Sequence, residues 1–168
     1  KTPNAYLLTG IRGVGKTTTA RLIAKALNCQ KNTDEKTKCS GEKFCPTCEE
    51  IINSNHIDIL EMDAASKTGI DDIRELIESS KYSPTSAKYK IFIIDEVHML
   101  SKQAFNGLLK TLEEPPPSLK FILATTEARK IPVTILSRCQ RFDLKRVSVN
   151  KLCDHLKNIS KKENGKIS

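Results

Sequence analysis

A glycine-rich loop near the start of the chain ends in a lysine and a threonine. It matches the phosphate-loop pattern G-x-x-x-x-G-K-[ST] at every position and a second threonine follows it: Gly10, Ile11, Arg12, Gly13, Val14, Gly15, Lys16, Thr17 and Thr18. Glycine lets the backbone curl so that successive N–H groups point at a phosphate, and Lys16 can reach the β- and γ-phosphates. The Thr17 hydroxyl can bind magnesium. These residues are therefore predicted to bind a nucleoside triphosphate with Mg²⁺.

Two carboxylates follow four apolar residues in the segment 91–96, whose sequence is IFIIDE. Such a run is typical of a strand covered by helices on both faces, and parallel α/β sheets bind ligands at the carboxyl ends of their strands. Asp95 is therefore predicted to hold magnesium together with Thr17. Glu96 is predicted to orient and deprotonate an attacking water, which makes hydrolysis the expected reaction.

Four of the six cysteines lie within twenty residues of one another, and this clustering suggests a metal site: Cys29, Cys39, Cys45 and Cys48. Cytosolic thiols stay reduced, so three disulfides are not expected. The alternative is a set of free structural thiols. Cys139 and Cys153 stand apart and are interpreted as small buried hydrophobes. The three histidines share no metal-ligand spacing, so each is expected to be structural: His56, His98 and His155.

Segments of strand and helix character alternate along the chain. Predicted strands cover residues 5–9, 56–62, 90–95, 119–125 and 140–144, and predicted helices cover 18–28, 70–82, 101–114 and 149–162. Ser101 is a predicted N-cap, and the run Pro115-Pro116-Pro117 should end the helix before it. The alternation predicts a parallel α/β sheet whose first strand leads directly into the glycine-rich loop.

The chain has 168 residues, enough for one domain with appendages, and a formal net charge of +8. Much of the positive charge lies in residues 129–168, which contain 11 basic and 3 acidic groups. This excess fits contact with nucleic acid as well as it fits a lysine-rich solvated surface. No apolar run approaches the roughly 20 residues of a membrane helix, and no signal peptide precedes the first strand. The expected location is the cytoplasm.

Several segments together resemble the AAA+ ATPase domain of the bacterial DNA polymerase III gamma/tau family. They are AYLLTGIRGVGKTTTARLIAKALNC at 5–29, IIDEVHMLS at 93–101, FNGLLKTLEEPP at 105–116 and FILATTEARKIPVTILSRCQRF at 121–142. The resemblance implies a three-layer P-loop NTPase of the AAA+ class, with a mostly parallel five-stranded central sheet and an inserted zinc module. It assigns residues 1–147 to an N-terminally truncated nucleotide-binding domain, about 29–52 to the zinc insertion, and 148–168 to the start of a helical lid whose remainder, with the collar, is absent.

The resemblance also implies roles for particular residues. Thr126, in the segment LATT, resembles the sensor of the γ-phosphate, with Thr125 as the weaker candidate. Arg138, in the segment SRC, resembles an arginine finger that reaches the ATP site of an adjacent subunit. The four clustered cysteines resemble the family's zinc ligands, although Cys29-x9-Cys39-x5-Cys45-x2-Cys48 has a longer gap before its last pair than the C-x2-C-x2-C spacing of the family.

The function implied by the resemblance is that of an ATP-hydrolysing motor subunit that loads the sliding clamp onto primed DNA. Its implied partners are the other clamp-loader subunits, the clamp, primed DNA and, through absent C-terminal regions, the polymerase core; its implied cofactors are ATP, Mg²⁺ and Zn²⁺. The isolated domain is expected to be a weak ATPase because Arg138 would act in trans. The alternatives are a non-hydrolysing structural subunit, which the intact loop disfavours, and a small-molecule P-loop kinase, which the SRC arginine and the cysteines disfavour.

Overall fold

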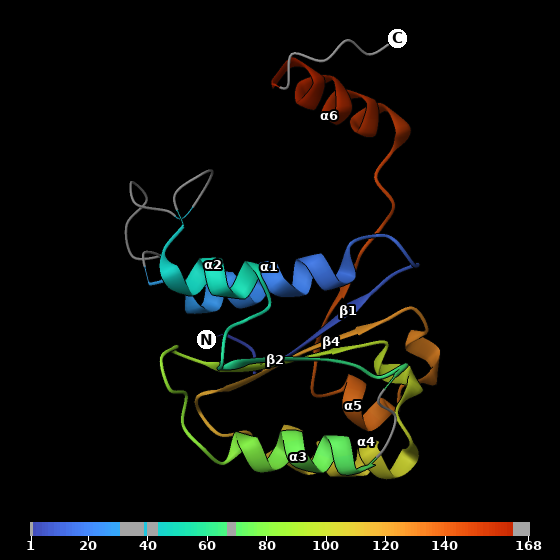
Figure 1. Ribbon diagram of the computed structural model, residues 1–168. Helices are drawn as coiled ribbons and strands as arrows, with labels where there is room; N and C mark the ends of the chain where they lie inside the picture. The colour runs from blue at the N-terminus through green and yellow to red at the C-terminus, as the bar shows by residue number, and fades with distance from the viewer. Residues whose placement is uncertain (1, 31–38, 40–43, 67–69, 163–168) are drawn as a thin grey trace.

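The computed structural model describes residues 2–30, 39, 44–66 and 70–162, which contain five strands and six α-helices (Figure 1). In chain order these are β1 (Ala5–Thr9), α1 (Lys16–Asn28), α2 (Pro46–Ile52), β2 (Ile59–Asp63), α3 (Ile70–Ser80), β3 (Lys90–Asp95), α4 (Lys102–Glu113), β4 (Leu119–Thr125), α5 (Val133–Leu136), β5 (Gln140–Asp143) and α6 (Val149–Lys162). Short 3-10 turns η2 (Val97–Met99) and η3 (Ala128–Lys130) follow β3 and β4.

The five strands form one parallel sheet in the order β2-β3-β4-β1-β5. Thr9 at the end of β1 is in register with Thr125 at the end of β4, and Asp63 of β2 is in register with Asp95 of β3. The segments that follow β1, β3 and β4 therefore lie together at the carboxyl ends of the strands, which is where parallel α/β proteins bind ligands. The predicted α/β class and five-stranded sheet are confirmed.

Helices cover both faces of the sheet, so the chain forms three layers. Figure 1 shows α1 and α2 on one face and α3, α4 and α5 on the other. Every residue of β1 and β4 is buried, as expected for strands covered on both sides. On the α3 and α4 side, Phe92 and Phe121 meet edge to face with ring centroids 5.5 Å apart. This packing fixes β3 beside β4, which carry the acidic and threonine residues of the candidate site.

Some sequence-based boundaries were wrong. The first helix begins at Lys16 rather than at residue 18, immediately after Gly15. Strand β2 begins at Ile59 rather than at residue 56. The Asp58 side chain accepts backbone N–H groups from Thr85 and Ala87, so Asp58 does not continue the strand. Helix α3 ends at Ser80 rather than at residue 82, and α2 was not expected. The Ser101 N-cap is confirmed, since its side chain accepts the Ala104 N–H.

Helix α6 stands apart from the layered part of the chain in Figure 1, and its described residues are exposed apart from Ser160. Cys153 lies on this helix and is exposed, so its interpretation as a buried hydrophobe was wrong. Cys139 is partly buried and packs against the core on the α4 side. None of the described helices combines the length and apolar character needed to cross a bilayer.

Candidate nucleotide site

The glycine-rich loop is held in a conformation that exposes backbone N–H groups at the start of α1. Gly15 has φ 91° and caps this helix, a left-handed backbone that a residue with a Cβ rarely adopts. The Lys16 side chain is only 6% exposed, and its Nζ donates to the backbone oxygens of Gly10 and Ile11 at 3.0 and 3.1 Å. The Lys16 side chain thus lies against its own loop at the start of α1, and the amino end of a helix is where anions bind.

Gly10 sets the close approach between the loop and the last strand. Its φ is 153°, and a Cβ added there would lie 2.7 Å from the backbone oxygen of Leu144. Leu144 N in turn donates to Thr9 O at 2.7 Å, which ties the end of β1 to the end of β5. A side chain at position 10 would force these two strand ends apart and displace the start of the loop.

The two predicted acids face the loop from the end of β3. Asp95 accepts a hydrogen bond from the Thr17 hydroxyl, and its second oxygen accepts the Glu96 N–H at 2.9 Å. Glu96 has φ 47° and ψ 43°, a strained conformation for a residue other than glycine that turns its side chain back toward the loop. Its Oε1 lies 4.0 Å from the Lys16 Nζ. The sheet thus brings Lys16, Thr17, Asp95 and Glu96 together.

A cavity of about 450 Å³ separates the loop from the acids. It is lined by Arg12, Gly13, Gly15, Lys16, Thr17, Thr18, Asp95 and Glu96. The lining combines two basic side chains with two threonine hydroxyls and two carboxylates, and such groups can bind a triphosphate together with a hard divalent cation. Thr17 and Asp95 already touch each other, so the residues present fit Mg²⁺. The predicted nucleotide-binding residues Gly10 and Ile11 line a neighbouring cavity instead, together with Thr126.

Thr126 and Thr125, the two sensor candidates, lie at the end of β4 but make different contacts. Thr126 donates both its backbone N–H and its hydroxyl to Glu96 Oε2, at 3.1 and 2.9 Å. Thr125 is fully buried, and its hydroxyl lies 3.0 Å from His98 Nδ1 and accepts the Glu127 N–H. Only Thr126 therefore contacts the acid that faces the cavity.

His98 joins this group, although its spacing gave no metal-ligand or catalytic signal. Its side chain is 6% exposed, with Nδ1 3.3 Å from Glu96 Oε2 and Nε2 3.5 Å from Glu127 Oε1. Glu127 also accepts from Lys130, and this contact, more than the nearby His98, lowers the pKa of the Glu127 carboxyl. In the sequence His98 lies two residues after Glu96, which fits its place beside this acid but indicates no metal-ligand or catalytic role.

Arg138 is not brought to the site of its own chain. Strand β5 runs parallel to β1 and pairs Gln140 with Tyr6, so Arg138 precedes the amino end of the sheet, whereas the loop follows its carboxyl end. The strand alone separates the two edges by roughly 10 Å, at about 3.3 Å per residue. The guanidinium instead bonds Glu113 Oε1 at 2.7 Å.

The four clustered cysteines converge where α1 ends and α2 begins. Their sulfur atoms all lie within 4.8 Å of one another, and Cys45 and Cys48 are buried. The Cys45 N–H donates to Cys39 Sγ at 3.3 Å. Burial raises the pKa of the Cys45 thiol, but hydrogen bonds from backbone N–H groups such as that of Cys48 outweigh it and lower the pKa to about 7. Four sulfurs with N–H donors suit a tetrahedral zinc ion. Residues 31–38 and 40–43 of the expected insertion lie outside the described residues.

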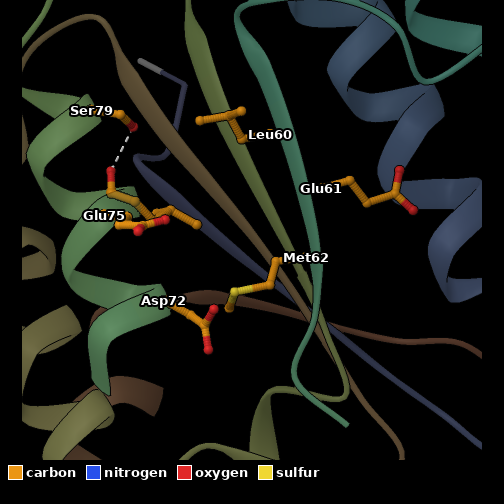
Figure 2. A pocket seen from close by; sticks show the side chains of 7 residues that line it. Leu60, Glu61, Met62, Asp72, Glu75 and Ser79 are labelled. Atoms are coloured by element: carbon orange, nitrogen blue, oxygen red, sulfur yellow. Dashed lines mark hydrogen bonds between the residues drawn. The ribbon is translucent and has the colours of Figure 1, made fainter. Parts of the chain in front are cut away.

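Another hollow, of about 250 Å³, lies between α3 and the edge strand β2 (Figure 2). In Figure 2, Leu60 and Met62 point toward α3, where Asp72 and Glu75 lie, whereas Glu61 points to the opposite side. There Glu61 forms a two-bond ion pair with Arg21 of α1, at 2.9 and 2.7 Å. No residue predicted to bind nucleotide or metal lines this hollow.

Comparison with known proteins places these features in a family. The model of the family described as DNA polymerase III, delta subunit, matches residues 1–148. The chain is 52% identical over 161 residues to DNA polymerase III subunit tau/gamma of Haemophilus influenzae, covering 96% of this chain and 23% of that protein. It is 49% identical over 160 residues to DNA polymerase III subunit tau of Escherichia coli, covering 95% and 24%. The chain thus spans about a quarter of the length of these relatives.

Solved structures share the fold. A DNA polymerase III gamma subunit-related protein from Thermotoga maritima is 26% identical and superposes with a TM-score of 0.65, over 88% of this chain and 43% of that one. The Holliday junction branch migration motor RuvB of the same organism is 20% identical with a TM-score of 0.63, over 98% and 45%. The second likeness concerns the fold alone. Both agree with the AAA+ P-loop fold that the sequence resemblance implied.

Proposed function

We propose, because the chain belongs to the family described as DNA polymerase III, delta subunit, and is about half identical to tau/gamma subunits, that it binds and hydrolyses ATP as the motor part of a bacterial clamp loader. The observation that carries this proposal is the single cavity in which Lys16 and the N–H groups of the loop face Asp95 and Glu96. A non-hydrolysing subunit would not need an acid held opposite an intact phosphate loop.

Each residue has a part in the proposed reaction. The N–H groups from Gly13 to Thr18 and the Lys16 ammonium bind the phosphates, which places the γ-phosphate next to Glu96. The Glu96 carboxylate orients the attacking water and takes its proton. Thr17 and Asp95 would hold Mg²⁺, which neutralises developing charge on the phosphate oxygens when bound. Thr126 would register the γ-phosphate, because it contacts Glu96 directly.

Arg138 is proposed to serve the ATP site of an adjacent subunit. Its place at the amino edge of the sheet, away from its own loop, supports a role in trans. A planar guanidinium there can spread over the charge that develops on a transferring phosphoryl group. A lone chain would then hydrolyse ATP slowly, and assembly with sister subunits would complete each site.

The remaining parts of the chain are assigned by the same proposal. Residues 1–147 form the nucleotide-binding domain, the four cysteines hold structural Zn²⁺, and α6 starts a helical lid. The proposed partners are other clamp-loader subunits, the sliding clamp and primed DNA, with the polymerase core contacted by other parts of the longer protein. The proposed location is the cytoplasm, where replication proteins meet DNA.

The test is the rate of ATP hydrolysis by the full-length subunit, measured alone and with partner subunits, clamp and primed DNA. We expect a low rate for the subunit alone and strong stimulation by the complete set. Matched assemblies carrying Lys16→Ala should lose nucleotide binding and this stimulation. Absence of hydrolysis in every mixture would instead identify a structural subunit, and rapid turnover by a verified monomer would contradict the role of Arg138 in trans.

A further inference from the structure

We propose that Glu113 is a positioning residue that holds Arg138 ready for the nucleotide of a neighbouring subunit. This inference rests on the proposed function of Arg138 in trans and adds a second residue to it. Glu113 is the last residue of α4 and is 25 positions before Arg138, and neither the nucleotide cavity nor the cysteine cluster includes it.

Helices α4 and α5 both bind the guanidinium group of Arg138 through hydrogen bonds. Arg138 Nη2 donates to Glu113 Oε1 at 2.7 Å, and Nη1 donates to the backbone oxygen of Thr134 in α5, also at 2.7 Å. A weaker contact of 3.4 Å joins Nη1 to the Ser137 hydroxyl. Contacts from α4 and α5 fix both ends of the guanidinium plane, which one contact alone would leave free to rotate.

The contacts with Glu113, Thr134 and Ser137 do not use all the N–H donors of the Arg138 guanidinium. Arginine carries five N–H groups in a rigid fork, and among the described residues the contacts of Arg138 involve only Nη1 and Nη2. The Arg138 side chain is 33% exposed, so part of it is accessible to an approaching ligand. The contacts therefore orient the Arg138 side chain and leave N–H donors for a phosphate.

Holding the arginine affects the reaction more than the stability of the fold. The Glu113 side chain is 45% exposed, and an ion pair this exposed contributes little to stability. A free arginine side chain must lose rotamer freedom when it reaches a phosphate, whereas one already fixed loses less. Removing the Glu113 carboxylate should therefore lower the catalytic rate at the neighbouring site and leave folding intact.

The experiment uses the full-length subunit assembled with its partner subunits, clamp and primed DNA. In Glu113→Ala assemblies we expect kcat for ATP to fall about tenfold, with the KM for ATP within about twofold of wild type. Glu113→Gln keeps an acceptor oxygen for Nη2 and should restore most of the rate. Glu114→Ala, which alters the adjacent exposed acid, is the matched control and should behave as wild type.

Arg138→Ala in the same assembly separates failure of this inference from failure of the proposed function. If Arg138→Ala hydrolyses ATP at the wild-type rate, the proposed role in trans is wrong. If Arg138→Ala is slow but Glu113→Ala matches or exceeds wild type, the arginine acts without help from Glu113, and the positioning role alone is overturned. Glu113→Gln as slow as Glu113→Ala would also overturn it. Unchanged melting temperatures would show that the variants fold.

Discussion

Glu96 Oε2 accepts two hydrogen bonds from Thr126, one from the backbone N–H at 3.1 Å and one from the hydroxyl at 2.9 Å. The two residues follow adjacent parallel strands, β3 and β4, and are 30 positions apart in the chain. One oxygen of the carboxylate is thereby occupied, while Oε1 remains on the side of Lys16. The end of β4 thus determines the direction in which the proposed general base points.

Removal of the Thr126 hydroxyl should slow hydrolysis without preventing ATP binding. Thr126→Val keeps the backbone N–H and the approximate shape of the side chain but leaves Glu96 Oε2 with one fewer donor. We expect single-turnover hydrolysis in the assembled complex to fall about tenfold or more, because a misoriented base transfers its proton less effectively. Thr126→Ser, which restores the hydroxyl, should recover most of the rate; an equally slow serine variant would contradict this account.

Substitution of Glu96 itself should separate binding from chemistry. Glu96→Gln keeps the size of the side chain and an acceptor for Thr126 but cannot take a proton. Hydrolysis should fall by about 100-fold or more, while equilibrium binding of a fluorescent ATP analogue stays close to wild type. Lys16→Ala is the contrasting variant and should lose binding. A Glu96→Gln protein that still turns over ATP at the wild-type rate would show that another group activates the water.

The phosphate loop and the sheet were predictable because their signals are local. The loop pattern, the apolar run before Asp95 and the Ser101 cap each depend on residues within one segment. The contacts that orient the site are not local: Thr126 with Glu96 and Glu113 with Arg138 join segments 30 and 25 residues apart. Spacing along the chain does not show which side chains meet across strands or between helices.

The errors in the predicted elements have physical causes of the same kind. The alternation of residues 56–62 predicts one continuous strand, but Asp58 instead satisfies the N–H groups of a loop near residues 85–87. Helix α2 has only seven residues, begins with Pro46 and ends soon after the cysteines, so it lacks the length that reveals helical periodicity. Cys153 was misjudged because its distance from the other cysteines in the sequence does not show whether a neighbouring element covers it.

Removal of zinc should destabilise the end of α1 and the helix that follows it. Four sulfurs within 4.8 Å of one another would repel as thiolates, or accept their N–H groups only weakly as thiols, once the ion is gone. We expect about one zinc per purified chain and a clearly lower melting temperature after chelation. Cys48→Ser should lower the zinc content and the melting temperature, whereas Cys153→Ser, at an exposed position, should change neither. Metal-free protein with an unchanged melting temperature would favour structural thiols.

Asp58 should make stability depend on pH in the acidic range. It is 2% exposed and accepts the backbone N–H groups of Thr85, Ser86 and Ala87 at 2.8 to 2.9 Å. Burial raises the pKa of this carboxyl, but the three N–H contacts outweigh it and hold the pKa below its usual value. The stabilisation is therefore present above the unfolded-state pKa of about 4 and is lost as the pH falls through the folded-state value.

Because the stabilisation depends on the ionised Asp58 carboxylate, Asp58→Asn should be less stable than wild type at neutral pH. The difference in stability between the two proteins should be smaller in acid. The amide offers one acceptor oxygen to three N–H groups, so we expect a loss of roughly 2 kcal/mol in the free energy of unfolding at pH 7. Urea unfolding at pH 7 and pH 3 measures the difference, which should shrink at the lower pH. Asp71→Asn removes a carboxylate from an exposed pair with Arg74 and should have little effect at either pH. If Asp58→Asn lowers the free energy of unfolding equally at pH 7 and pH 3, the charge of Asp58 is not the source of the stabilisation.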